Sequence, residues 1–534
     1  MADTKTYFIG QWDTFHSNGP FATKILYDTR LERPEIMPSL TDRYNDAAHE
    51  VQQLIQECIA NNDRFRAYGS GWSLSDIAHQ PDRMLYTGRM NLKRTIDPYE
   101  LHNASVFKSQ DLFFFQCGTT IKEISEFLFS HGKSLKTSGA SNGQTIGGSI
   151  STGIHGSAFD TGAVQDSVAG LNLIIGPGPN DNVYIERHTQ PALNDDFARL
   201  INARVIRNDG LFNAALVGLG SFGFIHGVLI EADDLFLLKR YTRRIKPAVA
   251  LKLAETMNFR DSEFKIPSEL DATGKGIRPY HFKVYVNPYN KKEEYITEII
   301  YKKEYRTNYP NPIPDIKKAI YKDLPTWMAR FAEKHSRLIP KFIGALKGQI
   351  FPDLDKDIEG TLGEIFWDTT HKGAAFAFTF GIDIKDTRKA LNLFIRVVNE
   401  EGPVPGAIAL RFIRASKAIL AFTKFPMTCI LEMDGILWKG SSTMISFEDF
   451  QKKLLEVFIA EGIKFTIHWG KNAASSLPGL IDYMYGDNDD IWKNYRSALL
   501  SKQMADVFSN GFLDTIRLSD YRVNVPKNLV DSLI

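Results

Sequence analysis

Apolar and polar residues follow their most regular pattern between residues 374 and 469. Alternation over residues 374–384 predicts a strand, and apolar side chains on one face of residues 386–399 predict a helix. Further along come strands at about 407–414 and 428–435, a helix between Ser446 and Gly462, and a strand at 464–469. The resulting order, βαββαβ, is that of a ferredoxin-like unit.

Strand alternation divides the residues of this unit between two sheet faces. Helices would cover one face, which takes Leu410, Phe412, Leu431 and Met433. The opposite face receives Arg411, Glu432, Asp434, Thr466 and His468, beside the small residues Ala375, Ala377 and Thr379. Charged side chains above such gaps favour a pocket lining, and an ordinary solvated face is the alternative.

Glycines recur within apolar sequence in the first 230 residues. A predicted strand at 64–68 runs into Gly69–Ser73, and a second at 112–116 is followed by Gly118 and a helix. Residues 138–157 contain six Gly, five Ser and no charged side chain, and residues 216–230 repeat the theme. Such loops allow close backbone approach and offer N–H groups to anions, although a Gly/Ser linker has a similar composition. Four of them together favour one extended ligand.

Composition narrows the class of protein. With 534 residues, 43% hydrophobic and 24% charged, the chain has the composition of a soluble globular protein of several domains. A net charge of +1 gives no electrostatic case for a nucleic acid partner. Three distant cysteines suggest neither disulfides nor a metal site. Without a visible signal peptide or an apolar run of about 18 residues, we expect a cytoplasmic protein with no membrane span.

Four stretches carry a family resemblance: RAYGSGWS at 66–73, QCGTTIKEI at 116–124, QTIGGSISTGIHGS at 144–157 and GLGSFGFIHGV at 218–228. In order and spacing they resemble the vanillyl-alcohol-oxidase family, and within it the sugar and aldonolactone oxidase branch, which includes alditol oxidases. The resemblance implies an α+β protein with a two-subdomain PCMH-type FAD-binding domain and a ferredoxin-like substrate cap domain.

The resemblance also implies the domain boundaries. An N-terminal extension covers 1–40, the FAD-binding domain 41–235 and the cap domain 236–471, with a helical insertion at about 315–360. The Lys/Arg cluster LLKRYTRRIK at 237–246 marks the change of composition after the first domain. The segment 472–534 resembles the family's final segment, which returns to the FAD-binding domain.

FAD is the cofactor that the resemblance implies. Its contacts would be Arg66, Tyr68, Gly69, Ser70, Gly71, Trp72, Ser73, Ser138, Gly139, Gly143, Thr145, Gly147, Gly148, Ser151, Thr152, His155, Gly156, Ser157, Gly220, Gly223, Ile225, His468 and Lys471. Many members carry a covalently linked His where this chain has Trp72, and no Cys is present in 138–143. FAD is therefore expected to be non-covalent or to be attached elsewhere. His155 is expected to contact the flavin, and a linkage at His155 is the less favoured alternative.

The active-site residues are carried over in the same way. IHWGK at 467–471 resembles a signature whose Lys reaches the flavin, which makes Lys471 the leading choice. The family's Glu-x-Arg matches Ala409-x-Arg411, so the Arg is kept and the Glu is lost. Glu432, Asp434 and His468 are the candidate bases, left unranked. Both carboxylates could instead only form ion pairs with Arg411 and Lys471.

The expected activity is oxidation of a CH–OH group, with a small alcohol, polyol or sugar lactone as substrate and O2 as acceptor. A small residue at Gly139 is associated with oxygen reactivity in lactone oxidases. The lost Glu keeps a bulky sterol-like or aromatic alcohol open. A dehydrogenase using quinone or cytochrome, and a flavin-binding protein without turnover, are also open.

Overall fold

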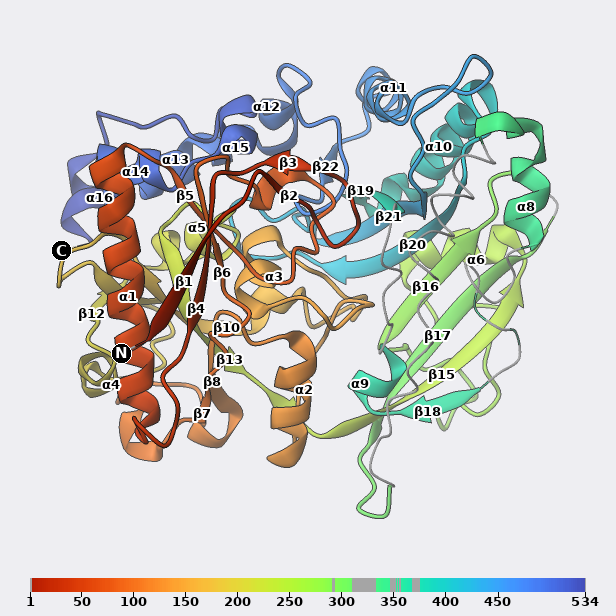
Figure 1. Ribbon diagram of the computed structural model, residues 1–534. Coiled ribbons are helices and arrows are strands. Elements are labelled where there is room, and N and C mark those ends of the chain that lie inside the picture. The colour runs from red at the N-terminus through yellow and green to blue at the C-terminus, as the bar shows by residue number, and fades with distance from the viewer. Residues whose placement is uncertain are drawn as a thin grey trace.

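The computed structural model describes residues 2–290, 293–309, 333–345, 352, 354, 357–366 and 375–533. Two sheets form the first half of the chain, on the left in Figure 1. The smaller has the order β1 (Asp3–Phe8), β4 (Ile25–Arg30), β6 (Arg83–Tyr86), β5 (Phe65–Tyr68). The larger has the order β12 (Arg204–Arg207), β11 (Asn182–Glu186), β10 (Val168–Ile174), β13 (Phe224–Glu231), β8 (Leu112–Gln116), β7 (Lys93–Thr95). This is the two-part arrangement that the sequence predicted.

Helices of the first unit begin and end at the expected signals. The side chain of Ser39 accepts from the backbone N–H of Asp42 at the start of α1 (Leu40–Asn61), which ends at Asn62 in the left-handed conformation. Thr120 and Glu123 form a capping box at the start of α2 (Ile121–Ser130). The remaining helices here are α3 (Ile146–Thr152), α4 (Asp195–Leu200) and α5 (Asp209–Leu216).

One eight-stranded sheet, on the right in Figure 1, forms the second unit. Its order is β18 (Ile358–Gly360), β15 (Phe236–Ile245), β17 (Tyr295–Glu304), β16 (His281–Val286), β20 (Gly406–Arg414), β21 (Met427–Ile436), β19 (Ala375–Asp383), β22 (Phe465–Ile467). The last four strands, with α10 (Thr387–Glu401) and α11 (Phe447–Ala460), are the predicted ferredoxin-like unit. Ser446 caps α11 as expected.

The first four strands of this sheet repeat the same arrangement. β15, α6 (Pro247–Thr256), β16, β17 and β18 follow one another in sequence, and the spatial order β18-β15-β17-β16 is that of a second ferredoxin-like half. Antiparallel pairing of β16 with β20 joins the two halves. The Lys/Arg cluster after residue 235 forms most of strand β15, which pairs with β17 on one side and with β18 on the other.

Helices α6, α10 and α11 cover one face of the large sheet, and the other face turns toward the first unit (Figure 1). On the covered face Leu410, Phe412, Leu431 and Met433 are fully buried, as the alternation predicted. The sheet therefore leaves one face for a site between the two units.

The chain ends on the first unit. Helices α12 (Leu480–Tyr485), α13 (Asn488–Leu499), α14 (Lys502–Val507), α15 (Gly511–Thr515) and α16 (Lys527–Asp531) follow the last strand. Arg496 donates to the carbonyl of Ser221, and Asn510 donates to that of Ile77. At the other terminus, the residues predicted as an extension supply β1 and β4 of the first sheet.

Much of the predicted insertion at 315–360 lies outside the described residues. Helix α8 (Ile339–Ala345) lies within that range, and α9 (Leu362–Ile365) follows directly after it. Among the helices that the structure describes, none combines the length and apolar character needed to cross a bilayer.

Candidate active site

A cavity of about 920 Å³ lies between the glycine-rich loops of the first unit and the open face of the large sheet. Most of the predicted site residues line it. They are Arg66, Tyr68, Gly69, Ser70, Gly71, Trp72, Ser73, Ser138, Gly139, Thr145, Gly147, Gly148, Ser151, Thr152, His155, Gly156, Ser157, Gly220, Gly223, Ile225, Arg411, Asp434, His468 and Lys471. Gly143 and Glu432 do not line the cavity, but each contacts residues that do: Gly143 lies beside Trp72, and Glu432 pairs with Arg411 and Lys471.

The loop wall is packed so closely that side chains are excluded at particular glycines. A Cβ on Gly69 would lie 2.0 Å from the hydroxyl of Thr145, and one on Gly156 would lie 2.1 Å from that of Thr137. Three separate loops therefore meet backbone against side chain at one end of the cavity. This gives a ligand direct access to main-chain groups.

The same loops hold polar atoms that lack partners within the chain. Ser149, on α3, lines the cavity, and its buried hydroxyl has no hydrogen-bond partner among the described residues. The side-chain amide of Asn142 is also buried without a partner there, but Asn142 does not line the cavity. Buried polar groups are normally satisfied, so the Ser149 hydroxyl fits a polar ligand. Glycine-bounded backbone together with this unpaired hydroxyl fits the phosphates and ribityl chain of FAD.

Trp72 occupies the position at which the family resemblance places a linkage His. Its ring stacks on Phe15, with centroids 4.4 Å apart and planes 8° apart, and meets His16 edge-on. Gly143 makes room for it, because a Cβ there would lie 2.5 Å from the indole. Gly143 thus acts through Trp72. The N-terminal residues Phe15 and His16 also belong to the site, although no local pattern in their segment pointed to it.

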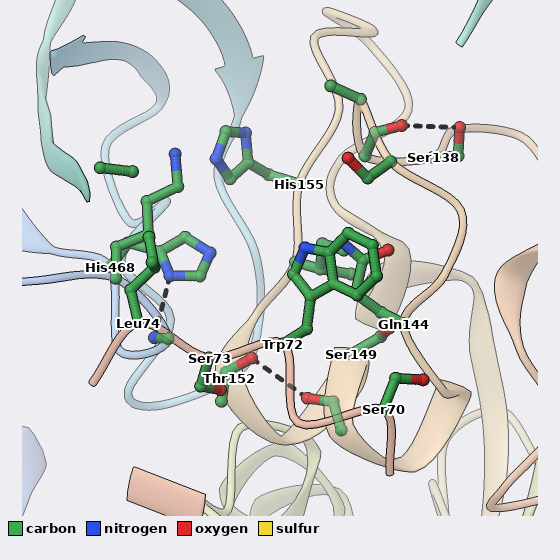
Figure 2. Close-up of a pocket in the computed structure, with 18 of the residues that line it drawn as sticks. Ser70, Trp72, Ser73, Leu74, Ser138, Gln144, Ser149, Thr152, His155 and His468 are labelled. Atoms are coloured by element: carbon green, nitrogen blue, oxygen red, sulfur yellow. Dashed lines mark hydrogen bonds between the residues drawn. The ribbon is translucent and has the colours of Figure 1, made fainter. Parts of the chain in front are cut away.

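Two histidines from different units lie next to each other in the cavity lining (Figure 2). The ring centroids of His155 and His468 lie 5.4 Å apart. Burial, followed by the charges of Lys471 and Arg411, lowers the pKa of His155 to about 3. Burial and the neighbouring His155 likewise hold the pKa of His468 well below its ordinary value. Both rings are therefore neutral.

The neutral state fixes the tautomer of His468. The backbone N–H of Gly470 donates to its Nδ1 at 3.0 Å, so the ring proton resides on Nε2. His468 can then donate a hydrogen bond from Nε2 but has no free lone pair there. Of the three candidate bases, it is the one least suited to accept a proton.

Glu432 forms a buried bridge between the two predicted cations. Its carboxylate lies 2.6 Å from Nη2 of Arg411 and 2.8 Å from Nζ of Lys471, and its side chain is 0% exposed. Burial alone would raise the pKa of Glu432, but the charges of Arg411 and Lys471 outweigh it and hold that pKa well below its ordinary value. Glu432 is thus a permanent anion that positions both cations.

Asp434 behaves in the opposite way. Burial, followed by the negative charge of Glu432, raises the pKa of Asp434. It lines the cavity, and its Oδ1 atom has no hydrogen-bond partner among the described residues. A carboxylate with a raised pKa and an open lone pair is suited to exchange a proton with a ligand.

Arg66 lines the cavity but is held by the protein. Its guanidinium donates to the carbonyls of Ile77, Leu219 and Gly220. Burial, followed by repulsion from Arg496, lowers its pKa to about 9. Arg66 therefore ties β5 to the loop before β13, and its role as a ligand contact stays a prediction.

The first half of the sheet contributes residues that sequence reasoning missed. Arg240, His281, Lys283, Tyr285 and Glu298 line the cavity from β15, β16 and β17. The sequence HFKVYV at His281–Val286 did carry a signal, because polar His, Lys and Tyr alternate with Phe, Val and Val. The described residues contain no group of three or more His, Cys, Asp or Glu side chains that could hold a metal ion.

Comparisons with known proteins agree with this geometry. Residues 45–179 match the family described as FAD binding domain. The chain is 26% identical over 219 residues to the D-arabinono-1,4-lactone oxidase of Debaryomyces hansenii, covering 40% of this chain and 35% of that protein. It is 24% identical over 216 residues to the L-gulonolactone oxidase of Mus musculus, covering 40% and 41%. The chain thus spans well under half the length of these relatives.

The fold likeness extends over nearly the whole chain. A structure titled "Solvent-stable cholesterol oxidase" superposes with a TM-score of 0.65 at 12% identity, covering 97% of this chain and 98% of that one. The chain therefore has the fold of that structure, and its residues 45–179 match an FAD-binding domain. More narrowly, the predicted resemblance to the aldonolactone oxidase branch of the vanillyl-alcohol-oxidase family is confirmed.

Proposed function

We propose that the protein is an FAD-dependent oxidase of a CH–OH group in an alcohol, polyol or sugar lactone, with O2 as electron acceptor. The observation that carries the proposal is the Arg411–Glu432–Lys471 bridge. It stands beside the proton-accepting Asp434, on a sheet face that is opposed to the loops of an FAD-binding domain.

FAD, when bound, supplies the hydride acceptor of the reaction. The chain's own residues then have separable tasks. Lys471 and Arg411 bind the substrate hydroxyl and stabilise the alkoxide that develops on it. Asp434 accepts the hydroxyl proton at its open Oδ1 atom, and its raised pKa makes it a stronger base than an ordinary aspartate. His468 donates from Nε2 to a substrate oxygen.

The missing Glu of the family motif has a replacement on the neighbouring strand. Ala409 stands where the Glu would be, and its cross-strand partner in the sheet is Glu432. Directly opposite residues have side chains about 5 Å apart, so a carboxylate from Glu432 reaches the space that Ala409 leaves. We infer that Glu432 on β21 takes the role of the missing Glu on β20, so that Arg411 still has a carboxylate partner.

We infer that FAD is held without a covalent bond. An indole cannot form the histidine linkage, and Trp72 is occupied by its stack on Phe15. His155 donates from Nδ1 to the carbonyl of Gly156, which holds the ring against the loop. The packed glycine loops and the unpaired hydroxyl of Ser149 would then retain the cofactor.

Anaerobic reduction tests the proposal directly. Purified protein is mixed without oxygen with a panel of polyols, lactones, aromatic alcohols and sterols, and the flavin absorbance is followed. We expect bleaching by at least one member, and then peroxide release when air is admitted. Flavin that no CH–OH compound bleaches would overturn the proposal.

The electron acceptor is tested separately at Gly139. A Cβ at this position would lie 3.0 Å from Cδ1 of Ile154, so alanine narrows the space beside the loop. We expect Gly139→Ala to slow re-oxidation by air while leaving anaerobic reduction by substrate intact. Equal rates of air oxidation in both proteins, together with fast turnover on a quinone, would favour a dehydrogenase.

A further inference from the structure

The cavity continues beyond the proposed reaction centre onto the first half of the large sheet. Strand β16 pairs with β20 so that Lys283 lies opposite Arg411 and Tyr285 lies opposite Ala409. Both β16 side chains line the cavity. The wall that faces the bound ligand is therefore built from two ferredoxin-like halves, only one of which carries the residues assigned to the chemistry.

The carboxylates nearest this extension already have partners. Glu298 accepts from the hydroxyl of Tyr285 at 2.6 Å and lies 3.3 Å from Nη1 of Arg240. Glu432 is shared between Arg411 and Lys471. Asp434 also lines the cavity, but it forms no ion pair among the described residues, and burial raises its pKa. None of the three carboxylates therefore lies in direct contact with a further cation.

Lys283 is that further cation. It forms no ion pair with a carboxylate of the described residues, and its Nζ lies 4.4 Å from the centroid of the Tyr285 ring. Burial, followed by the charge of Arg411, lowers its pKa to about 8, so the ammonium is still mostly protonated at neutral pH. The charges of Glu432, Glu298 and Asp434 act on the ammonium from beyond ion-pair distance and offset the cost of its burial only in part. An anionic ligand group in direct contact would stabilise it further.

We propose that Lys283 binds a carboxylate of the substrate, so that the oxidised compound is a hydroxy acid or an anionic polyol rather than a neutral one. This inference rests on the proposed function. One unneutralised ammonium matches a monoanion better than a phosphate dianion. Strand β16 lies one strand spacing, about 5 Å, from β20, which carries Arg411, and two spacings, about 10 Å, from β21, which carries Asp434. The carboxylate therefore lies one to several bonds from the oxidised carbon.

Matched substrate pairs test the proposal. Each hydroxy acid is paired with the diol of the same chain length, from three to eight carbons, and gluconate is paired with sorbitol. The parent, Lys283→Met and Lys283→Arg are compared. Lys389→Met is the control. Lys389 lies on helix α10 and is about half exposed, and its replacement removes the same charge from the same unit.

We expect the parent to favour the acid of at least one pair. Lys283→Met should lower kcat/KM for that acid about 10- to 100-fold, mainly through KM, which is the usual effect of losing one charge-assisted hydrogen bond. The matched diol should change less than twofold. Lys283→Arg should restore part of the loss, and Lys389→Met should behave as the parent.

A binding measurement separates this proposal from the proposed oxidase activity. Butyrate, which has no hydroxyl to oxidise, is titrated into the FAD-loaded protein, and the shift of the flavin spectrum gives its Kd. Weaker butyrate binding in Lys283→Met supports the anion site even if no CH–OH compound is oxidised. Butyrate affinity and acid preference that are both the same in Lys283→Met and in the parent would overturn it, whatever alcohol the enzyme oxidises.

Discussion

Replacing Glu432 by glutamine tests the electrostatic reasoning behind the site. The substitution keeps the shape of the side chain but removes the charge that Arg411 and Lys471 share at 2.6 and 2.8 Å. The exposed fractions of these side chains are 11% for Arg411, 19% for Lys471 and 0% for Glu432, so water cannot replace the lost carboxylate. Removing one partner of a buried ion pair costs about 3–5 kcal/mol, and we expect Glu432→Gln to lose that much stability.

The assay is urea unfolding of parent and variant at the same FAD concentration. The control is Glu401→Gln, because Glu401 forms an exposed pair with Lys453 at 3.6 Å, and exposed pairs contribute at most about 1 kcal/mol. The pH dependence gives a second readout. The folded-state pKa of Glu432 lies below its ordinary value of 4.5, so its contribution is present above pH 4.5 and is lost as the pH falls below.

Glu432→Gln should therefore remove part of the parent's loss of stability in acid. A variant with the stability of Glu401→Gln at pH 7 and an unchanged acid profile would refute the buried bridge. Catalysis should also fall, because both cations lose the group that positions them.

Three further changes have defined outcomes. Acid precipitation should release the yellow colour into the supernatant, because Trp72 cannot form the covalent link, and colour in the pellet would contradict this. Asp434→Asn should lower the rate of anaerobic flavin reduction about 10²- to 10⁴-fold, the usual contribution of a general base, and a stopped-flow rate within tenfold of the parent would exclude it. Gly69→Ala should weaken FAD binding, because its Cβ would lie 2.0 Å from a neighbouring hydroxyl. Gly511→Ala is the matched control, because a Cβ at Gly511 would meet no atom within 4 Å. Equal FAD Kd values for Gly69→Ala and Gly511→Ala would contradict a role of the close packing at Gly69 in FAD binding.

Local sequence patterns were sufficient for the second half of the large sheet. The alternation around Arg411 and Glu432 put both on one face, and the structure joins them in an ion pair. Their protonation states could not be predicted, because a pKa depends on which charges burial brings together. Thus Glu432 and Asp434, two residues apart on one strand, are shifted in opposite directions.

The first half of that sheet escaped prediction for a different reason. Strand β15 contains four basic residues in ten and does not show a clear apolar alternation. It is held in the sheet by β17 and β18, which lie far away in the sequence. Long-range pairing of this kind overrides local propensity, so Arg240 and Glu298 could not be assigned to the site from their own segments. The alternation around Lys283 indicates a strand, but it does not show that this strand pairs with β20.

The duplicated architecture of the cap sheet has an evolutionary consequence. A tandem repeat gives a protein two copies of one scaffold, and mutations in one copy need not disturb what the other has acquired. Here Arg411, Glu432 and Lys471 belong to the later copy, or follow directly from it, and Arg240, Lys283 and Glu298 belong to the earlier one. Substitutions confined to the first half of the sheet could therefore change substrate specificity, in nature or in the laboratory, while the proposed reaction residues in the second half stay unchanged.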